Sequence, residues 1–247
     1  MLHYSKAESD RFGYRIFRGN LDEIQIDQIL SILLKENVEI AIVRLPVKNV
    51  RVVQHLQKNN IQFILADTLL YYTLHPTATP TEINYGIEVE PYQDYHSEIL
   101  NHLVHSIFSA YKNHYSHNAL LNSQFIAPGY FEWITTTCKG QQGKCWLLKY
   151  NQQFAGFIAC KFTDKTCEII LNGVLPAFAN RGIYTNGLKH VIHYCEQNHY
   201  TTILISTQID NVKVQRVWQN LNFKLSHGYY TIHILSKEIS LKYTSLQ

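Results

Sequence analysis

The chain has 247 residues, of which 46% are hydrophobic and 17% are charged, and its net charge is +3. This composition is typical of a globular protein that folds as one large domain or two small ones. The charge is too mild to indicate nucleic-acid binding, but it suits a small anionic ligand. No apolar run approaches the roughly 20 residues of a membrane span, and no signal stretch is evident, so we expect a cytoplasmic protein. The five cysteines lack a C-x-x-C pair, which favours reduced core thiols and no metal site.

The first part of the chain alternates helical and strand patterns. Residues 22–35 have helical apolar spacing, 39–44 form an apolar β-rich run, and a second helical pattern contains Val53 and Leu56. A strand containing Tyr71 and Tyr72 follows. This order predicts an α/β fold. Two prolines among threonines then predict a linker, so we divide the chain into an N-terminal domain over 1–75 and a linker over 76–85.

The second part, residues 86–236, begins with a predicted helix near 96–111. The patterns then predict strands at 145–150, 154–162 and 166–174, a helix at 185–197, a strand at 201–207 and a helix containing Val214 and Trp218. Residues 237–247 form a C-terminal tail.

The two parts contain a repeat. Residues 49–52 resemble 211–214, and the match continues at a constant offset through Gln57 with Gln219 and Asn60 with Asn222. Both copies read strand, helix, strand. The two copies differ in the connection that leads into the preceding helix. In the second copy residues 180–184 form a loop, whereas the corresponding connection at 18–21 is shorter and lacks that loop. We therefore expect one anion site per chain.

That site is predicted at a strand, loop and helix start. A buried strand over 169–174 ends before Pro176, and Gly182 precedes the helix. Free N–H groups and the helix dipole attract phosphate at such a helix start. Gly182 permits close approach of a pyrophosphate, and Arg181 adds a charged donor.

These residues resemble the acyl-CoA segment of GCN5-related N-acetyltransferases (GNAT). The resemblance rests on Val174-x-Pro176, Arg181-Gly182-Ile183 and Leu188, and on Asn211, which precedes an aromatic residue by seven positions. It covers residues 86–236 and implies a GNAT fold, a mixed twisted sheet flanked by helices, with an incomplete GNAT-like N-terminal half. It also implies acyl-CoA as co-substrate. The residues it assigns to acyl-CoA are Val174, Asn180, Arg181, Gly182, Ile183, Tyr184, Asn211 and Trp218.

A narrower resemblance is to nucleotide-sugar N-acyltransferases, including the dTDP-fucosamine acetyltransferases and the dTDP-amino-dideoxygalactose N-acyltransferases. It rests on residues 11–13, 129–134 and 205–208. It implies transfer of an acyl group to the amine of a dTDP-linked 3- or 4-amino-dideoxyhexose for surface polysaccharide (O-antigen or lipopolysaccharide). The donor is acetyl-CoA or a larger one such as 3-hydroxybutanoyl-CoA.

Three positions depart from the family pattern. Ala179 replaces an Arg or Gln, Tyr184 replaces a small residue, and Trp218 replaces the tyrosine that commonly protonates the departing thiolate. An indole N–H is no usable acid. Because a thiol has a pKa of about 8.5, a thiolate is an adequate leaving group even without a general acid. We therefore expect direct attack by the amine on the thioester. Tyr184 or a water replaces the acid, and a backbone N–H near Val174 polarises the carbonyl.

The acceptor is expected beside residues 111–118. His114 or His117 could accept the amine proton, Tyr115 could stack on thymine, and Tyr111 could contact the acceptor. Glu168 is an alternative base, and Tyr130 is a further candidate contact.

Two other functions remain open. One is acyl transfer to another amine, such as an amino acid, a polyamine or an antibiotic. The other is a non-catalytic acyl-CoA-binding module. The run 69–74 could form an edge strand that pairs in a homodimer.

Overall fold

The computed structural model describes residues 2–21, 26–76, 86–109 and 111–244. The first half comprises β1 (His3–Tyr4), α1 (Lys6–Phe12), β2 (Ile16–Asn20), α2 (Ile26–Lys35), β3 (Ile40–Pro46), α3 (Val50–Lys58) and β4 (Phe63–Leu74). The second half comprises β5 (Ile87–Pro91), α4 (Ser97–Phe108), α5 (Ile126–Lys139), β6 (Gly143–Tyr150), β7 (Gln153–Thr163), β8 (Thr166–Val174), α6 (Ile183–Gln197), β9 (Thr202–Gln208), α7 (Val212–Asn220), β10 (Lys224–Leu235) and α8 (Lys237–Thr244). Short 3₁₀ turns lie at 94–96, 123–125 and 176–178.

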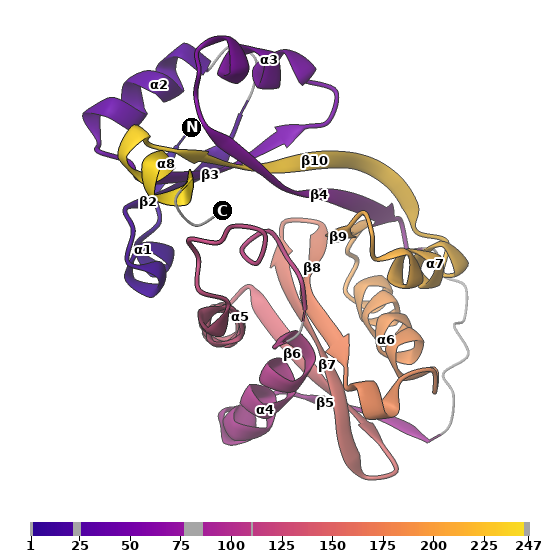
Figure 1. Ribbon diagram of the computed structural model, residues 1–247. Helices are drawn as coiled ribbons and strands as arrows, with labels where there is room; N and C mark the ends of the chain where they lie inside the picture. The colour runs from indigo at the N-terminus through magenta and orange to yellow at the C-terminus, as the bar shows by residue number, and fades with distance from the viewer. Residues whose placement is uncertain (1, 22–25, 77–85, 110, 245–247) are drawn as a thin grey trace.

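The described strands form one mixed sheet in the order β1-β2-β3-β10-β4-β9-β8-β7-β6-β5. At the centre of the sheet, β10 of the second half lies between β3 and β4 of the first half. β10 pairs antiparallel with both β3 and β4, and β4 pairs antiparallel with β9 (Figure 1). The sheet therefore continues across the expected domain boundary, which stays a prediction, as most of the linker lies outside the described residues.

The expectation of an edge strand at 69–74 is wrong. Leu69 to Thr73 pair with β10 on one side and with β9 on the other. The apolar character of this run comes from its position at the centre of the sheet, where both faces are covered. It has no free edge with which a second copy of the chain could pair.

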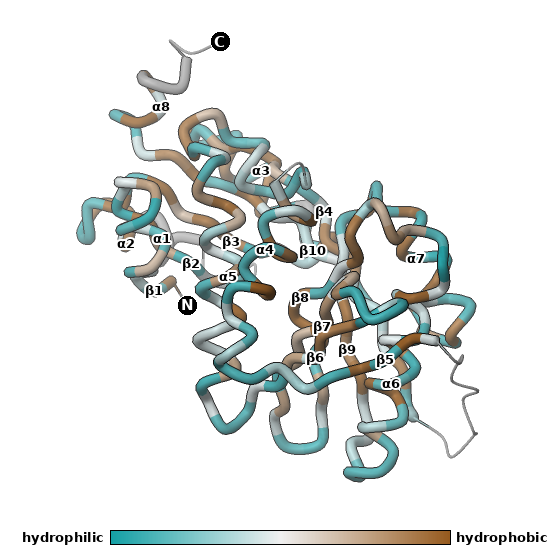
Figure 2. The backbone as a smooth tube through the Cα atoms, turned by 90° about the horizontal axis from the view of Figure 1, so that it is seen from below, coloured by the Kyte–Doolittle hydropathy of each residue, from teal (hydrophilic) through white to brown (hydrophobic). Residues whose placement is uncertain are grey.

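Helices cover both faces of the sheet. α6 and α7 pack on one face around Leu188, Ile205 and Trp218, and α4 and α5 pack on the other around Leu103 and Phe157. α3 covers β3 and β10 in the first half through Val52 and Leu56. Figure 2 shows hydrophobic segments in the central strands and polar segments in the outer loops. The predicted mixed sheet flanked by helices is confirmed.

The predicted elements recur with small shifts. The strand expected at 166–174 is β8, and the helix expected at 185–197 begins two residues earlier, at Ile183. The helix expected at 22–35 is described from Ile26, because 22–25 lie outside the described residues. α5 was not expected, since Pro128-Gly129 resembles a helix break. Pro128 lies in the first turn, where its missing N–H costs no helical hydrogen bond.

All five cysteines are free thiols, and four of them are buried. Within the described ranges, no helix combines the length and apolarity needed to cross a membrane. The same residues contain no group of three or more His, Cys, Asp or Glu side chains that could hold a metal ion.

Candidate active site

The sheet opens between β8 and β9. These parallel strands pair only from Thr166 with Thr202 to Ile169 with Ile205, and then they diverge. Beyond that point β9 keeps its pairing with β4, and β8 keeps its pairing with β7. A cavity of about 1040 Å³ occupies the opening, and residues from both faces of the sheet line it. The site is therefore a passage through the sheet, with α6 and α7 on one side and α4 and α5 on the other.

Backbone donors face this opening. The N–H of Leu175 donates to the Ala155 carbonyl on β7, at 2.8 Å. Because successive N–H groups of a strand point to opposite edges, the N–H of Val174 points away from β7 and toward the opening. Val174 also lines the cavity. This geometry suits the carbonyl-polarising role that the sequence predicts for it.

The loop before α6 has the backbone that the sequence predicts for an anion site. Asn180 has φ 62°, and Gly182, the residue before the helix, has φ 75°. A positive φ strains any residue with a Cβ and is favourable for glycine. Asn186, one turn into the helix, donates from Nδ2 to the Gly182 carbonyl at 2.9 Å. Asn180, Gly182 and Ile183 line the cavity, so the helix start faces it.

Arg181 lies outside the cavity lining. Its side chain is exposed, and its guanidinium carbon lies 5.4 Å from the ring centroid of Tyr150. The cation–π contact holds the guanidinium over β6. The predicted phosphate contact of Arg181 stays a prediction.

Tyr184 and Trp218 are joined by a hydrogen bond. The indole Nε1 of Trp218 donates to the Tyr184 hydroxyl at 2.9 Å, and both side chains line the cavity. Burial raises the pKa of Tyr184, and the hydrogen bond from Trp218 opposes that shift. Because the hydroxyl oxygen accepts from the indole, its own proton is free to be donated elsewhere. A phenol thus lies one hydrogen bond away from position 218, where the family pattern places a tyrosine.

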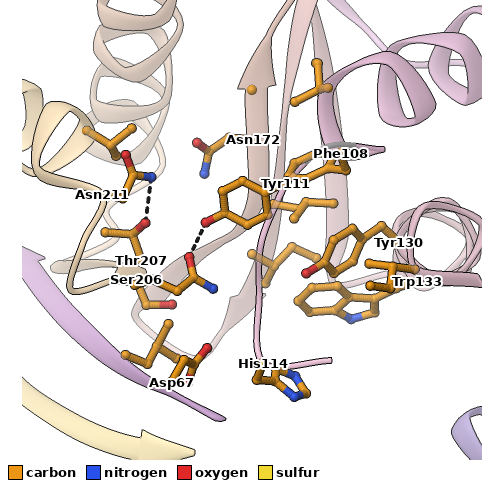
Figure 3. Close-up of a pocket in the computed structure, with 18 of the residues that line it drawn as sticks. Asp67, Phe108, Tyr111, His114, Tyr130, Trp133, Asn172, Ser206, Thr207 and Asn211 are labelled. Atoms are coloured by element: carbon orange, nitrogen blue, oxygen red, sulfur yellow. Dashed lines mark hydrogen bonds between the residues drawn. The ribbon is translucent and has the colours of Figure 1, made fainter. Parts of the chain in front are cut away.

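Asn211 and Tyr111 mark the middle of the cavity (Figure 3). Asn211 begins α7 and donates from Nδ2 to the Thr207 Oγ1 at 2.9 Å. Tyr111 donates its hydroxyl proton to the Gln208 side chain. These bonds tie the loop after α4 to the end of β9. Both residues line the cavity.

His114 belongs to a buried chain of hydrogen bonds with a defined direction. The Leu120 N–H donates to the Asn118 Oδ1 at 3.1 Å, so the Asn118 amide nitrogen faces the Nδ1 of His233, 3.0 Å away. The Nε2 of His233 lies 3.0 Å from the Nδ1 of His114. Burial lowers the pKa of both histidines, of His233 to about 3, so both rings are neutral. His233 must then donate from Nε2, and neutral His114 carries its proton on its own Nε2.

The other predicted acceptor residues are more enclosed. Tyr115 is 8% exposed, packs against Phe12 and His114, and donates its hydroxyl proton to Glu8. Tyr130 accepts a hydrogen bond from the Asn113 Nδ2 at 2.6 Å. Both line the cavity. Little of the Tyr115 ring is therefore available to stack on a base.

Glu168 and His117 differ in position. Glu168 lines the cavity near the point where β8 and β9 diverge. His117 is exposed and lies outside the cavity lining. The structure therefore brings Glu168, but not His117, to the cavity wall.

Two segments from the narrower resemblance meet at the cavity wall. Arg11 donates from Nη2 to the Glu132 Oε2 at 2.6 Å. Its guanidinium carbon lies 2.4 Å from where a Cβ on Gly129 would be, so any larger residue there would displace the Arg11 side chain. Both Arg11 and Gly129 line the cavity. An early arginine of the first half is thus packed against α5 of the second half.

Sequence reasoning missed the contribution of the first half. Its cavity-lining side chains include Glu8, Arg18, Arg44, Asp67 and Tyr71. Trp133 on α5, which is 45% exposed, was also not assigned to the site. Asp67 is the one charged residue in the run 61–72, and this was the available signal, because a carboxylate in a largely apolar strand requires a reason.

Comparisons with known proteins identify the family of this part of the chain. Residues 102–223 match the acetyltransferase (GNAT) family model. The chain therefore carries a GNAT acetyltransferase domain, whose family uses acyl-CoA as co-substrate. Among curated proteins it is similar to the spore coat polysaccharide biosynthesis protein SpsD of Bacillus subtilis, with 26% identity over 103 residues. That alignment covers 42% of this chain and 36% of the relative, so the match spans about a third of the relative's length.

Solved structures share the fold over nearly the whole chain. A GCN5-related N-acetyltransferase from Sphaerobacter thermophilus has a TM-score of 0.66 at 10% identity, covering 94% of this chain and 74% of its own. A functionally unknown conserved protein from Staphylococcus epidermidis has a TM-score of 0.60 at 13% identity, covering 90% and 84%. A tandem GNAT protein from the clavulanic acid biosynthesis pathway has 0.59 at 10% identity, covering 90% and 75%. The fold of this chain is therefore shared with these structures over both halves.

Proposed function

We propose that the protein transfers an acyl group from acyl-CoA to the amino group of a dTDP-linked 3- or 4-amino-dideoxyhexose in the cytoplasm. The acyl group is acetyl or a larger one such as 3-hydroxybutanoyl, and the product serves surface polysaccharide biosynthesis. One observation carries the proposal: the cavity runs through the opened sheet from the Gly182 helix start to a polar end that both halves line. The similarity to a polysaccharide biosynthesis protein supports a sugar-related acceptor.

The acceptor end has the groups that a charged sugar nucleotide requires. Arg44 lines this end of the cavity, and its Nη1 donates to the Tyr71 hydroxyl at 2.7 Å. Among the described residues, Arg44 has no carboxylate partner. A guanidinium that no carboxylate neutralises can bind phosphate oxygens. The half-exposed indole of Trp133 provides an aromatic surface at the same wall, which suits a pyrimidine base. These features support an acceptor that combines an anion with an aromatic ring.

The residues also support direct transfer within a ternary complex. The cavity holds both substrates together, which removes much of the entropy cost of their meeting. The Val174 N–H stabilises the oxyanion that forms on the thioester carbonyl. Tyr184 donates its hydroxyl proton to the departing sulfur, and Trp218 stabilises the resulting phenolate through the indole N–H.

Mass spectrometry tests the proposal. The protein is incubated with acetyl-CoA or 3-hydroxybutanoyl-CoA and a panel containing dTDP-linked 3- and 4-amino-dideoxyhexoses, amino acids, polyamines and aminoglycosides. We expect acylation of at least one dTDP-linked sugar, with kcat/KM above that of every other amine. Turnover only of another amine would contradict the sugar acceptor. Stabilisation by CoA in a thermal shift, without turnover of any amine, would indicate a non-catalytic acyl-CoA-binding module.

A further inference from the structure

Asp67 on β4 has a buried carboxylate oxygen without a partner. It lines the cavity, and among the described residues its Oδ1 makes no hydrogen bond although water cannot reach it. A buried polar atom in this state costs about 1–3 kcal/mol. Because Asp67 lines the cavity, a small turn of its side chain toward a bound cation relieves this cost.

A β-bulge turns Asp67 toward the cavity. In the pairing of β4 with β10, Asp67 lies opposite Thr231, but Leu65 lies opposite Ile232, so Ala66 is an extra residue. In a regular strand that contained Ala66 without a bulge, Asp67 would share a face with Leu65, whose cross-strand partner Ile232 is in the core under α3. Bulges occur next to active sites, where they redirect a side chain. The redirected side chain here is the carboxylate (Figure 3).

Among the described residues, Asp67 forms no ion pair, although Arg44 lies in the same row of the sheet. Thr231 lies opposite Arg44 on β3 and opposite Asp67 on β4, so the three residues form one row across the sheet. The Nε of Arg44 is also buried without a partner within the described part of the chain. Burial raises the pKa of Asp67, against hydrogen bonds from Thr231 and Gln208 and the charge of Arg44. The carboxylate is therefore a stronger base than an exposed one.

The other predicted bases are less suited to the task. The hydrogen bonds from Leu120 through His233 leave His114 with a proton on Nε2 and an occupied Nδ1. Neutral His114 can therefore donate a hydrogen bond to an acceptor but cannot take a proton from it. His117 lies outside the cavity lining. Asp67 and Glu168 are the carboxylates that remain on this wall near the sheet opening.

We propose that Asp67 binds the ammonium group of the acceptor and takes one proton from it, while His114 donates a hydrogen bond to an oxygen of the same acceptor. The inference rests on the proposed N-acyl transfer. The proton moves from nitrogen to the Asp67 carboxylate, and the freed lone pair forms the C–N bond. The C–S bond breaks with its electron pair on sulfur. Sulfur takes the Tyr184 proton, Tyr184 takes the second nitrogen proton, and Asp67 returns its proton to water.

The test compares Asp67→Asn with two matched variants. Asp67→Asn keeps the shape of the side chain and removes its basicity. Asp164→Asn makes the same change in an exposed turn between β7 and β8 and controls for the loss of one charge. Glu168→Gln removes the competing carboxylate. Each is assayed with acetyl-CoA and the best amine of the panel, and the Kd of CoA is measured by calorimetry.

We expect Asp67→Asn to lower kcat by about 10²–10⁴-fold, the usual share of a general base, without changing the Kd of CoA. Asp164→Asn should equal the wild type, and Glu168→Gln should lose less than Asp67→Asn. In Asp67→Ala, added acetate should restore part of kcat, because the vacated space admits a small carboxylate. A wild-type kcat in Asp67→Asn would overturn the inference. So would a larger loss in Glu168→Gln, or a loss in Asp67→Ala that acetate does not relieve.

The acceptor panel separates the two proposals. If the wild type acylates only an amine other than a dTDP-linked sugar, the proposed acceptor is wrong. The kcat values of the same variants with that amine then test the role of Asp67. If the wild type acylates a dTDP-linked sugar and Asp67→Asn is unaffected, the proposed function stands and the role of Asp67 does not.

Discussion

The two copies of the strand–helix–strand unit share a backbone but not a site. α3 and α7 are each preceded by an Asn, Asn49 and Asn211, and each is followed by an Asn with positive φ, Asn60 and Asn222. The preceding parallel pairs differ. β2 pairs with β3 over its whole length, from Ile16 to Asn20, whereas β8 leaves β9 after Ile169. The sheet opens in the second copy because β8 continues for five residues, to Val174, after its pairing with β9 ends, whereas β2 ends where its pairing ends.

At corresponding positions, the second copy has side chains that line the cavity, whereas the first copy has buried apolar side chains. Asn211 donates to Thr207, but the residue corresponding to Thr207 in the first copy is Leu45, which is fully buried. Trp218, whose indole reaches Tyr184, corresponds to Leu56, also buried in an apolar cluster. The first copy has thus filled the equivalent space with core. Its polar residues instead face the acceptor end of the site in the second copy.

The largest effect that depends on this difference is expected at Tyr184. Tyr184→Phe removes the proposed acid, and we expect kcat to fall by about 10²–10⁴-fold while the KM for acyl-CoA stays similar. Tyr194→Phe, on the same helix but outside the cavity lining, is the control. Steady-state kinetics with a saturating amine measure both. Equal kcat values in the two variants would assign the proton to water.

A smaller effect is expected on CoA binding at Gly182. Gly182→Glu places bulk and negative charge at the helix start, so we expect the Kd of CoA to rise about 100-fold, or roughly 3 kcal/mol. Gly13, with φ 73° at the end of α1, provides a matched variant in the first half. Gly13→Glu carries the same backbone strain and should leave the Kd unchanged. Calorimetry on both variants decides the comparison, and an unaltered Kd in Gly182→Glu would contradict the site.

The pH dependence of stability tests the contact between β10 and the loop after α4. His233 on β10 faces His114 of the acceptor loop, and its pKa is about 3, below the unfolded value of about 6.5. Between these values the unfolded chain binds a proton that the folded chain does not. Stability is therefore lost as pH falls through about 6.5, at up to about 1.4 kcal/mol per pH unit. Urea unfolding of the wild type and His233→Gln at pH 7 and pH 5 should show a smaller acid loss in the variant.

The smallest effect is expected from restoring the family residue at 218. Trp218→Tyr exchanges an indole for a phenol beside Tyr184, and we expect kcat to change by less than about tenfold, because Tyr184 already supplies the acid. The variant is assayed beside Tyr184→Phe. A loss near 10³-fold would mean that the indole shapes the acyl pocket.

Local patterns were enough to predict the strand, loop and helix start that line one end of the cavity. The strand over 166–174, Gly182 and Asn211 lie close in sequence, and each has a local reason for its residue type. The acceptor side depends on pairings between distant segments. Arg44 and Asp67 meet only because β10 inserts between β3 and β4, and the bulge at Ala66 leaves no mark in the hydrophobic pattern. The Asn118–His233–His114 chain likewise joins residues more than 100 positions apart.

The exchange of β4 and β10 has a consequence for how the protein folds. β4 is synthesised early, yet one of its neighbours, β10, is formed by residues 224–235. Pairings between such distant segments form slowly, because a long loop must close before any contact is gained. During synthesis β4 therefore exposes an apolar edge until the second half is made. We expect the acceptor wall to assemble last, so a chain that is released early binds no acceptor and is prone to aggregate.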